Sequence, residues 1–81
     1  MIDRDLPIPA YRQLVGILRA EITAGRLAGR LPGERYLAQQ HDCAVNTVRR
    51  ALAILRDEGL VESVQGLGNF VIPPRRGQGL P

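Results

Sequence analysis

The chain contains no lysine and no tryptophan, and it has one cysteine and one histidine among its 81 residues. The single cysteine, Cys43, excludes an internal disulfide and favours a cytoplasmic protein. With His41 as the only histidine, no ligand set has the spacing of a zinc site. The carboxylates are scattered and have no histidine partner with which to form a catalytic pair. We therefore expect no metal, no cofactor and no enzymatic activity.

Long apolar runs are also missing. No stretch approaches the roughly 18 residues of a membrane-spanning helix, and the N-terminal MIDRDLP lacks the basic-then-apolar shape of a signal peptide. A chain of 81 residues forms one small domain with a compact core. We expect no membrane contact and no small-molecule effector site within this chain.

All eleven basic residues are arginine, set against eight acidic residues for a net charge of +3. The planar guanidinium can hold a phosphate or a guanine edge through two hydrogen bonds, which lysine cannot do. This composition suits a nucleic-acid partner. A GC-rich genome produces the same bias, so both explanations stay open.

The N-terminal third predicts an arm followed by a helix. Pro7 and Pro9 disfavour helix before Ala10, so residues 1–9 are expected to form an N-terminal arm or an extended lead-in. Gly25 is a natural helix stop. Between them the apolar residues fall on one helical stripe, formed by Tyr11, Leu14, Val15, Leu18 and Ile22.

The glycines and the proline of residues 26–33 predict a loop, with one short extended piece at Arg30–Leu31. A second helix is expected from Glu34, whose carboxylate complements the helix dipole, to about Gln40. After a turn at residues 41–43, a third helix runs to a stop at Gly59. Its inward stripe is Val45, Val48, Leu52 and Leu55, with Ala51 beside it.

The C-terminal third predicts a β-hairpin with strands at residues 60–64 and 69–72 and a tip at residues 65–68. Residues 73–81 form a flexible tail or a truncated linker. The predicted fold class is α+β, mainly α. It comprises three helices and a small antiparallel hairpin, spanning residues 10–72.

The outward face of the third helix carries the strongest functional signal. Its N-terminal half presents Asn46, Thr47, Arg49 and Arg50, the residue types that contact bases and phosphates. The solvated face of an ordinary surface helix has the same composition, so this pattern alone does not decide between the two.

The ordered run LPGERYLAQQHDCAVNTVRRALAILRDEGLVESVQGLGNFV, with PAYRQLVGILRAEITAGRL before it, resembles the winged helix-turn-helix domain of the GntR family of bacterial transcription regulators. The resemblance covers about residues 9–72. It implies sequence-specific binding of double-stranded DNA by a transcription regulator, a repressor rather than an activator. The matching residues are Leu31, Pro32, Glu34, Arg35, Leu37, Ala38, Thr47, Val48, Arg49, Ala51, Leu52, Gly59, Leu60, Val61, Gly66, Gly68, Phe70 and Val71.

The resemblance also implies which residues contact DNA. The third helix enters the major groove, where Arg49 and Arg35 suit guanine edges, while Gly66 brings the wing backbone close to the minor groove. Turn geometry is an alternative explanation for Gly66 and Gly68. The full set of expected contacts is Arg35, Val45, Asn46, Thr47, Arg49, Arg50, Gln65, Gly66 and Gly68.

The sequence departs from the family pattern at the turn, where Cys43, Ala44 and Val45 stand in place of Val-Ser-Arg. Loss of the serine cap costs about 1 kcal/mol, which Asp42 or a shifted helix start could offset. Val45 offers only an apolar contact to a thymine methyl. The helix dipole could lower the pKa of Cys43 and make it a redox switch. We favour the other interpretation, a small apolar residue in the turn core.

Members of the family usually dimerise and sense a small molecule through a C-terminal domain. A homodimer is expected to prefer an inverted-repeat operator, because two-fold protein symmetry is mirrored in the DNA site. The alternative function is a winged helix used as a protein–protein interaction module, with arginines that only keep it dissolved.

Overall fold

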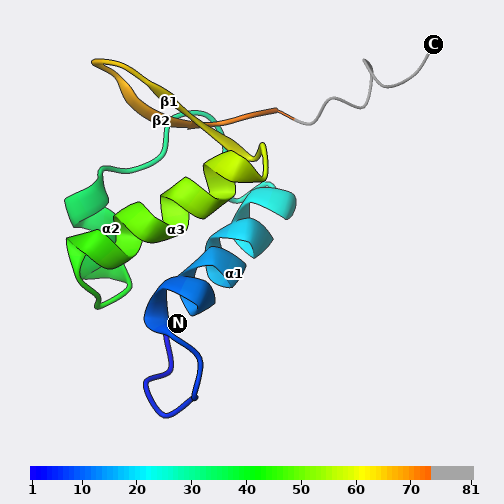
Figure 1. The fold of residues 1–81 in the computed structure, drawn as a ribbon. Helices are drawn as coiled ribbons and strands as arrows, with labels where there is room; N and C mark the ends of the chain where they lie inside the picture. The colour runs from blue at the N-terminus through cyan, green and yellow to red at the C-terminus, as the bar shows by residue number, and fades with distance from the viewer. Residues whose placement is uncertain (74–81) are drawn as a thin grey trace.

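The computed structural model describes residues 1–73 and contains three helices and one hairpin (Figure 1). Helices α1 and α2 both pack against α3, and β1 extends this packing from the hairpin. The predicted fold class is confirmed. All but the first residue of the expected tail, residues 73–81, lies outside the described residues. The elements are α1 (Ala10–Thr23), α2 (Glu34–Gln40), α3 (Val45–Asp57), β1 (Val61–Val64) and β2 (Gly68–Val71).

The ends of the two long helices follow from proline and glycine. Pro9 occupies the N-cap of α1, and the predicted stops Gly25 and Gly59 come one residue after the C-caps of α1 and α3. Gly59 has φ of 79°, a conformation that costs other residues a steric clash. It lets the Leu60 N–H reach back to the Leu55 carbonyl at 3.0 Å, which closes the helix end.

The hairpin is antiparallel, with Val61 opposite Val71 and Val64 opposite Gly68. The predicted extended piece is confirmed, because Arg30 forms an isolated bridge with Phe70. On either side of that bridge, Leu31 N–H donates to the Asn69 carbonyl and Val71 N–H donates to the Gly29 carbonyl, each at 2.8 Å. The loop before α2 thus fixes the wing against the helices.

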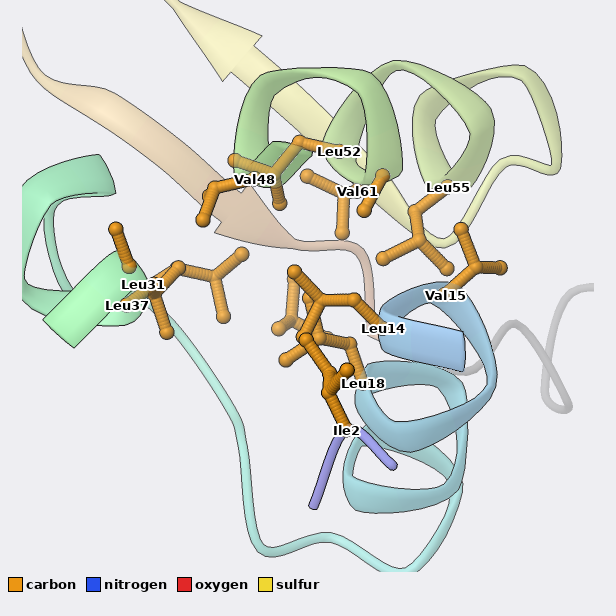
Figure 2. Packing of buried hydrophobic residues seen from close by; sticks show 13 residues of the cluster. Ile2, Leu14, Val15, Leu18, Leu31, Leu37, Val48, Leu52, Leu55 and Val61 are labelled. Carbon is orange, nitrogen blue, oxygen red and sulfur yellow. The ribbon is translucent and has the colours of Figure 1, made fainter. Parts of the chain in front are cut away.

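The predicted apolar stripes of α1 and α3 form part of the core, and residues from the N-terminal arm, the loop before α2, α2 and the hairpin complete it (Figure 2). The stripe residues at the edge of the helices, Tyr11, Ile22 and Val45, are only half-buried. The buried set comprises Ile2, Leu14, Val15, Leu18, Leu31, Leu37, Ala38, Val48, Ala51, Leu52, Leu55, Val61 and Val71.

The N-terminal arm differs from an extended lead-in. Its Ile2 is 8% exposed and belongs to the core, with Leu14 and Leu18 (Figure 2). The chain reverses after Ile2, where Leu6 N–H donates to the Asp3 carbonyl at 3.3 Å. The prolines keep the arm out of the helix, as expected, and the reversal returns it to the core.

Candidate nucleic-acid interface

A hollow of about 650 Å³ lies between α2 and the start of α3. It brings together Arg35 from the first turn of α2 and Val45 and Arg49 from α3, three of the residues predicted to contact DNA. Both arginines are exposed. The floor and rim are completed by Ala38, Gln39, Asp42, Cys43 and Ala44.

A second hollow of about 330 Å³ lies between the wing and the loop that enters α2. The predicted wing residues Gln65, Gly66 and Gly68 line one side of it, and the loop from Arg30 to Glu34 lines the other. The wing tip is therefore set beside the start of α2.

The two hollows meet at an ion pair. Arg49 donates from Nε to Glu34 Oε1 at 2.9 Å, and Glu34 lines the second hollow while Arg49 lines the first. The Arg49 side chain is 61% exposed. Within residues 1–73 its two Nη groups donate no hydrogen bond, so this edge of the guanidinium faces solvent. Arg35, Arg49 and the wing thus border one continuous surface.

Arg50 occupies a different position from Arg49. Its guanidinium stacks 3.9 Å from the centre of the Tyr11 ring of α1, an arrangement that stabilises a cation over an aromatic face. Arg12 approaches the same ring at 5.6 Å. Asn46 is exposed and Thr47 is half-buried, and neither lines the two hollows. The outward face of α3 therefore divides into a side toward the wing and a side toward α1.

The N-terminus of α3 has no side-chain cap. Ala44 is the N-cap in an extended conformation, and within residues 1–73 no side chain accepts a hydrogen bond from the first-turn N–H groups. Neither expected compensation occurs, because the helix starts at Val45 and Asp42 lies in the left-handed region with φ of 53°. Uncapped N–H groups and the positive end of the helix dipole favour a nearby anion.

Turn geometry accounts for both wing glycines. The tip is three residues long and is closed by Leu67 N–H donating to the Val64 carbonyl at 3.0 Å. Gly66 has φ of 82° and Gly68 has φ of 117°, both disfavoured for side chains. Their contact with DNA remains a prediction beside this structural requirement.

Cys43 is half-buried in the turn, and burial raises the pKa of its thiol above the ordinary value of 9.0. The nearby Arg4 lowers the pKa by less. Desolvation of the thiolate therefore dominates, which agrees with the favoured interpretation of Cys43 as a small apolar residue in the turn rather than with the redox switch. His41 is also half-buried, and burial lowers its pKa.

Within residues 1–73 no three His, Cys, Asp or Glu side chains are grouped so that they could hold a metal ion. None of the helices in this part of the chain is long and apolar enough to cross a membrane.

Two residues of the surface were missed by sequence reasoning. Glu34 was assigned only to the helix dipole, although it holds Arg49 from 15 positions away. Tyr11 was assigned only to the apolar stripe, although its ring supports Arg50. Neither contact has a signal in spacing along one helix, because each joins two elements.

Comparison with known proteins agrees with this geometry. Residues 10–71 match the family described as bacterial regulatory proteins, gntR family. The transcriptional repressor NagR of Bacillus subtilis is 40% identical over 81 residues, which is 98% of this chain and 33% of the relative. The transcriptional regulator SmoD of Agrobacterium fabrum is 42% identical over 66 residues, 79% of this chain and 28% of the relative.

Solved structures show the same fold. The AraR DNA-binding domain in complex with operator ORR3 superposes with a TM-score of 0.76 at 31% identity, covering 89% of each chain. A GntR family transcriptional regulator from Listeria monocytogenes gives a TM-score of 0.81 at 28% identity, covering 89% of this chain and 65% of the other.

The fold and the surface define a winged helix-turn-helix domain. The chain belongs to the gntR family of bacterial regulatory proteins. It spans about a third of the length of the curated relatives NagR and SmoD.

Proposed function

We propose that this chain binds double-stranded DNA in a sequence-specific manner as the DNA-binding part of a cytoplasmic transcription repressor. The observation that carries the proposal is the continuous surface on which Arg35, Arg49 and the wing are joined through the Glu34–Arg49 ion pair. The similarity to the AraR DNA-binding domain, whose structure was solved with operator DNA, supports it.

The two sides of α3 contact different parts of the duplex. Arg49, held at Nε, offers its two Nη groups to the O6 and N7 atoms of a guanine in the major groove. Val45 and Thr47 meet a thymine methyl or a phosphate at the start of the helix. Arg50, stacked on Tyr11, contacts the phosphate backbone. Gln65 and Gly66 carry the wing tip into the minor groove.

Two copies bind an inverted-repeat operator. The affinity of a single domain of this size comes largely from phosphate contacts, so one copy binds a half-site only weakly. The NagR and SmoD relatives are about three times as long as this chain. We place no small-molecule effector site within these residues.

Selection from a pool of random duplexes tests the proposal. The chain is expected to enrich a short motif containing at least one guanine, and a variant with Arg49→Ala is expected to lose that preference. A pool that shows no enrichment after repeated rounds would overturn sequence-specific binding. If binding to every duplex were also absent, the protein–protein interaction module would become the better account.

A further inference from the structure

The N-terminal arm, Met1–Pro9, precedes the residues that match the family, which begin at Ala10. It nevertheless has a defined structure. Asp5 N–H donates to Asp3 Oδ1 at 2.9 Å and Leu6 N–H donates to the Asp3 carbonyl at 3.3 Å, so the chain turns back on itself. The reversal lies at the end of the molecule opposite to the wing (Figure 1).

Gln13 of α1 fastens both sides of this reversal. Its Oε1 accepts a hydrogen bond from Asp3 N–H at 2.7 Å, and its Nε2 donates to the carbonyls of Asp3 and Ile8, each at 2.8 Å. One side-chain amide thus makes three hydrogen bonds to the arm. Such a set defines the path of the backbone far better than a single exposed contact.

Ile2 fixes the outer end of the arm by burial. Its side chain is 8% exposed and lies in the core cluster with Leu14 and Leu18 (Figure 2). Burial of this side chain removes apolar surface from water and so stabilises the folded-back path of the arm. An arm that only trailed from the domain would leave this residue in water.

Between these two anchors, Arg4 reaches the helix-turn-helix turn. Its guanidinium donates to the backbone carbonyl of Asp42. Asp42 has φ of 53°, in the left-handed region that residues with a side chain adopt uncommonly. The next residue, Cys43, donates its N–H to the Ala38 carbonyl at 2.9 Å and leads directly into α3.

We propose that Met1–Pro9 is an intramolecular clasp that holds the α2–α3 turn and so sets where α3, the recognition helix, begins. Arg4 is the positioning residue of this clasp. The effect on DNA binding rests on the proposed function, whereas the effect on the turn does not. Arg4 acts through Asp42 and makes no contact with DNA. The clasp compensates for the missing side-chain cap at Ala44, because it restrains the turn from the other side.

The test combines amide hydrogen exchange with DNA titration, using Arg4→Gln and Gln13→Ala. The first variant removes the contact to Asp42, and the second releases the arm without changing the charge. Both are expected to speed exchange of the Cys43 amide by about tenfold, the scale of one charge-assisted hydrogen bond, with core amides such as that of Leu52 unaffected. Arg19→Gln is the control, because it makes the same charge change and its partner, Glu58, is the C-cap at the other end of α3 from the turn.

In the titration both variants are expected to weaken binding to a duplex from the selected pool while the salt dependence stays that of the wild type. A change of slope by about 0.9 in Arg4→Gln alone, with unchanged exchange at Cys43, would mean that Arg4 is a phosphate contact and would overturn the clasp. Unchanged exchange in both variants overturns it as well. Failure of the wild type to bind DNA would refute the proposed function and leave the exchange result standing.

Discussion

Arg49 Nε lies 2.9 Å from Glu34 Oε1, so the recognition helix is tied to the first turn of α2 at the centre of the proposed interface. The pair leaves the Nη edge of Arg49 toward solvent. An arginine held at one edge loses less conformational entropy when the other edge binds a guanine. We therefore expect the Glu34–Arg49 ion pair to contribute more to the recognition of a base than to the free energy of unfolding.

Replacement Glu34→Gln separates these two consequences. The ion pair is exposed, so its loss is expected to change the free energy of unfolding by less than about 1 kcal/mol. Discrimination between a selected duplex and a random duplex is expected to fall several-fold, because the neutral amide of glutamine holds Arg49 less firmly than the carboxylate does. Urea unfolding and competitive anisotropy titration measure the two effects. Glu58→Gln, which weakens the exposed pair with Arg19 at the C-cap of α3, serves as the control and should leave discrimination unchanged.

The two neighbouring arginines of α3 are expected to differ in their effects on binding. Arg49→Ala should weaken binding to the selected duplex by roughly 1–3 kcal/mol and relax one base position. Arg50→Ala should weaken binding to all duplexes alike, because Arg50 lies against Tyr11 on the side toward α1. Titration of selected and random duplexes with each variant distinguishes the roles. Wild-type affinity and selectivity in both variants would show that the surface is placed wrongly.

His41 makes stability depend on pH. Burial, and next the N-terminal amine, lower its pKa below the ordinary value of 6.5, while Glu21 opposes them. The unfolded chain therefore binds the proton more readily, and the contribution of His41 is complete above about pH 6.5 and declines as the pH falls toward the folded pKa. His41→Asn should remove this decline between about pH 7.5 and about pH 5.5 in urea unfolding. The Glu58 carboxyl, whose pKa is lowered by Arg19, titrates below this window.

Cys43 is expected to be an unreactive thiol. Because burial raises its pKa, its thiolate is scarce at neutral pH, and the thiolate is the reacting form. Alkylation by iodoacetamide should be slower than that of a free cysteine, and mild peroxide should leave DNA binding unchanged. Cys43→Ala should bind DNA like the wild type. Rapid alkylation accompanied by loss of DNA binding would contradict this prediction and favour the redox-switch interpretation of Cys43.

The secondary structure follows from local patterns in the sequence. The period of the apolar residues located all three helices, and Gly25 and Gly59 marked two of their ends. The extended piece at Arg30–Leu31 was also predictable, since the glycines and the proline around it exclude helix. These features depend on neighbours within a few residues, which one sequence contains in full.

The contacts between different helices and strands could not be predicted from the sequence in the same way. The Arg49–Glu34 pair, the stacking of Arg50 on Tyr11 and the burial of Ile2 each join segments that become neighbours only after packing. The pKa of Cys43 shows the same limit, because the sequence places a helix end beside it but does not show how much water the fold removes.

The most direct test of the central claim is an anisotropy titration of a labelled duplex with the wild-type chain at about 50 mM and about 200 mM salt. If arginines on this surface neutralise phosphates, each such contact lowers the affinity by about 3.5-fold between the two concentrations. We predict detectable binding at the lower concentration and a loss of affinity that reflects several contacts. Undetectable binding at the lower concentration, or the same affinity at both, would contradict a DNA-binding surface formed by Arg35, α3 and the wing.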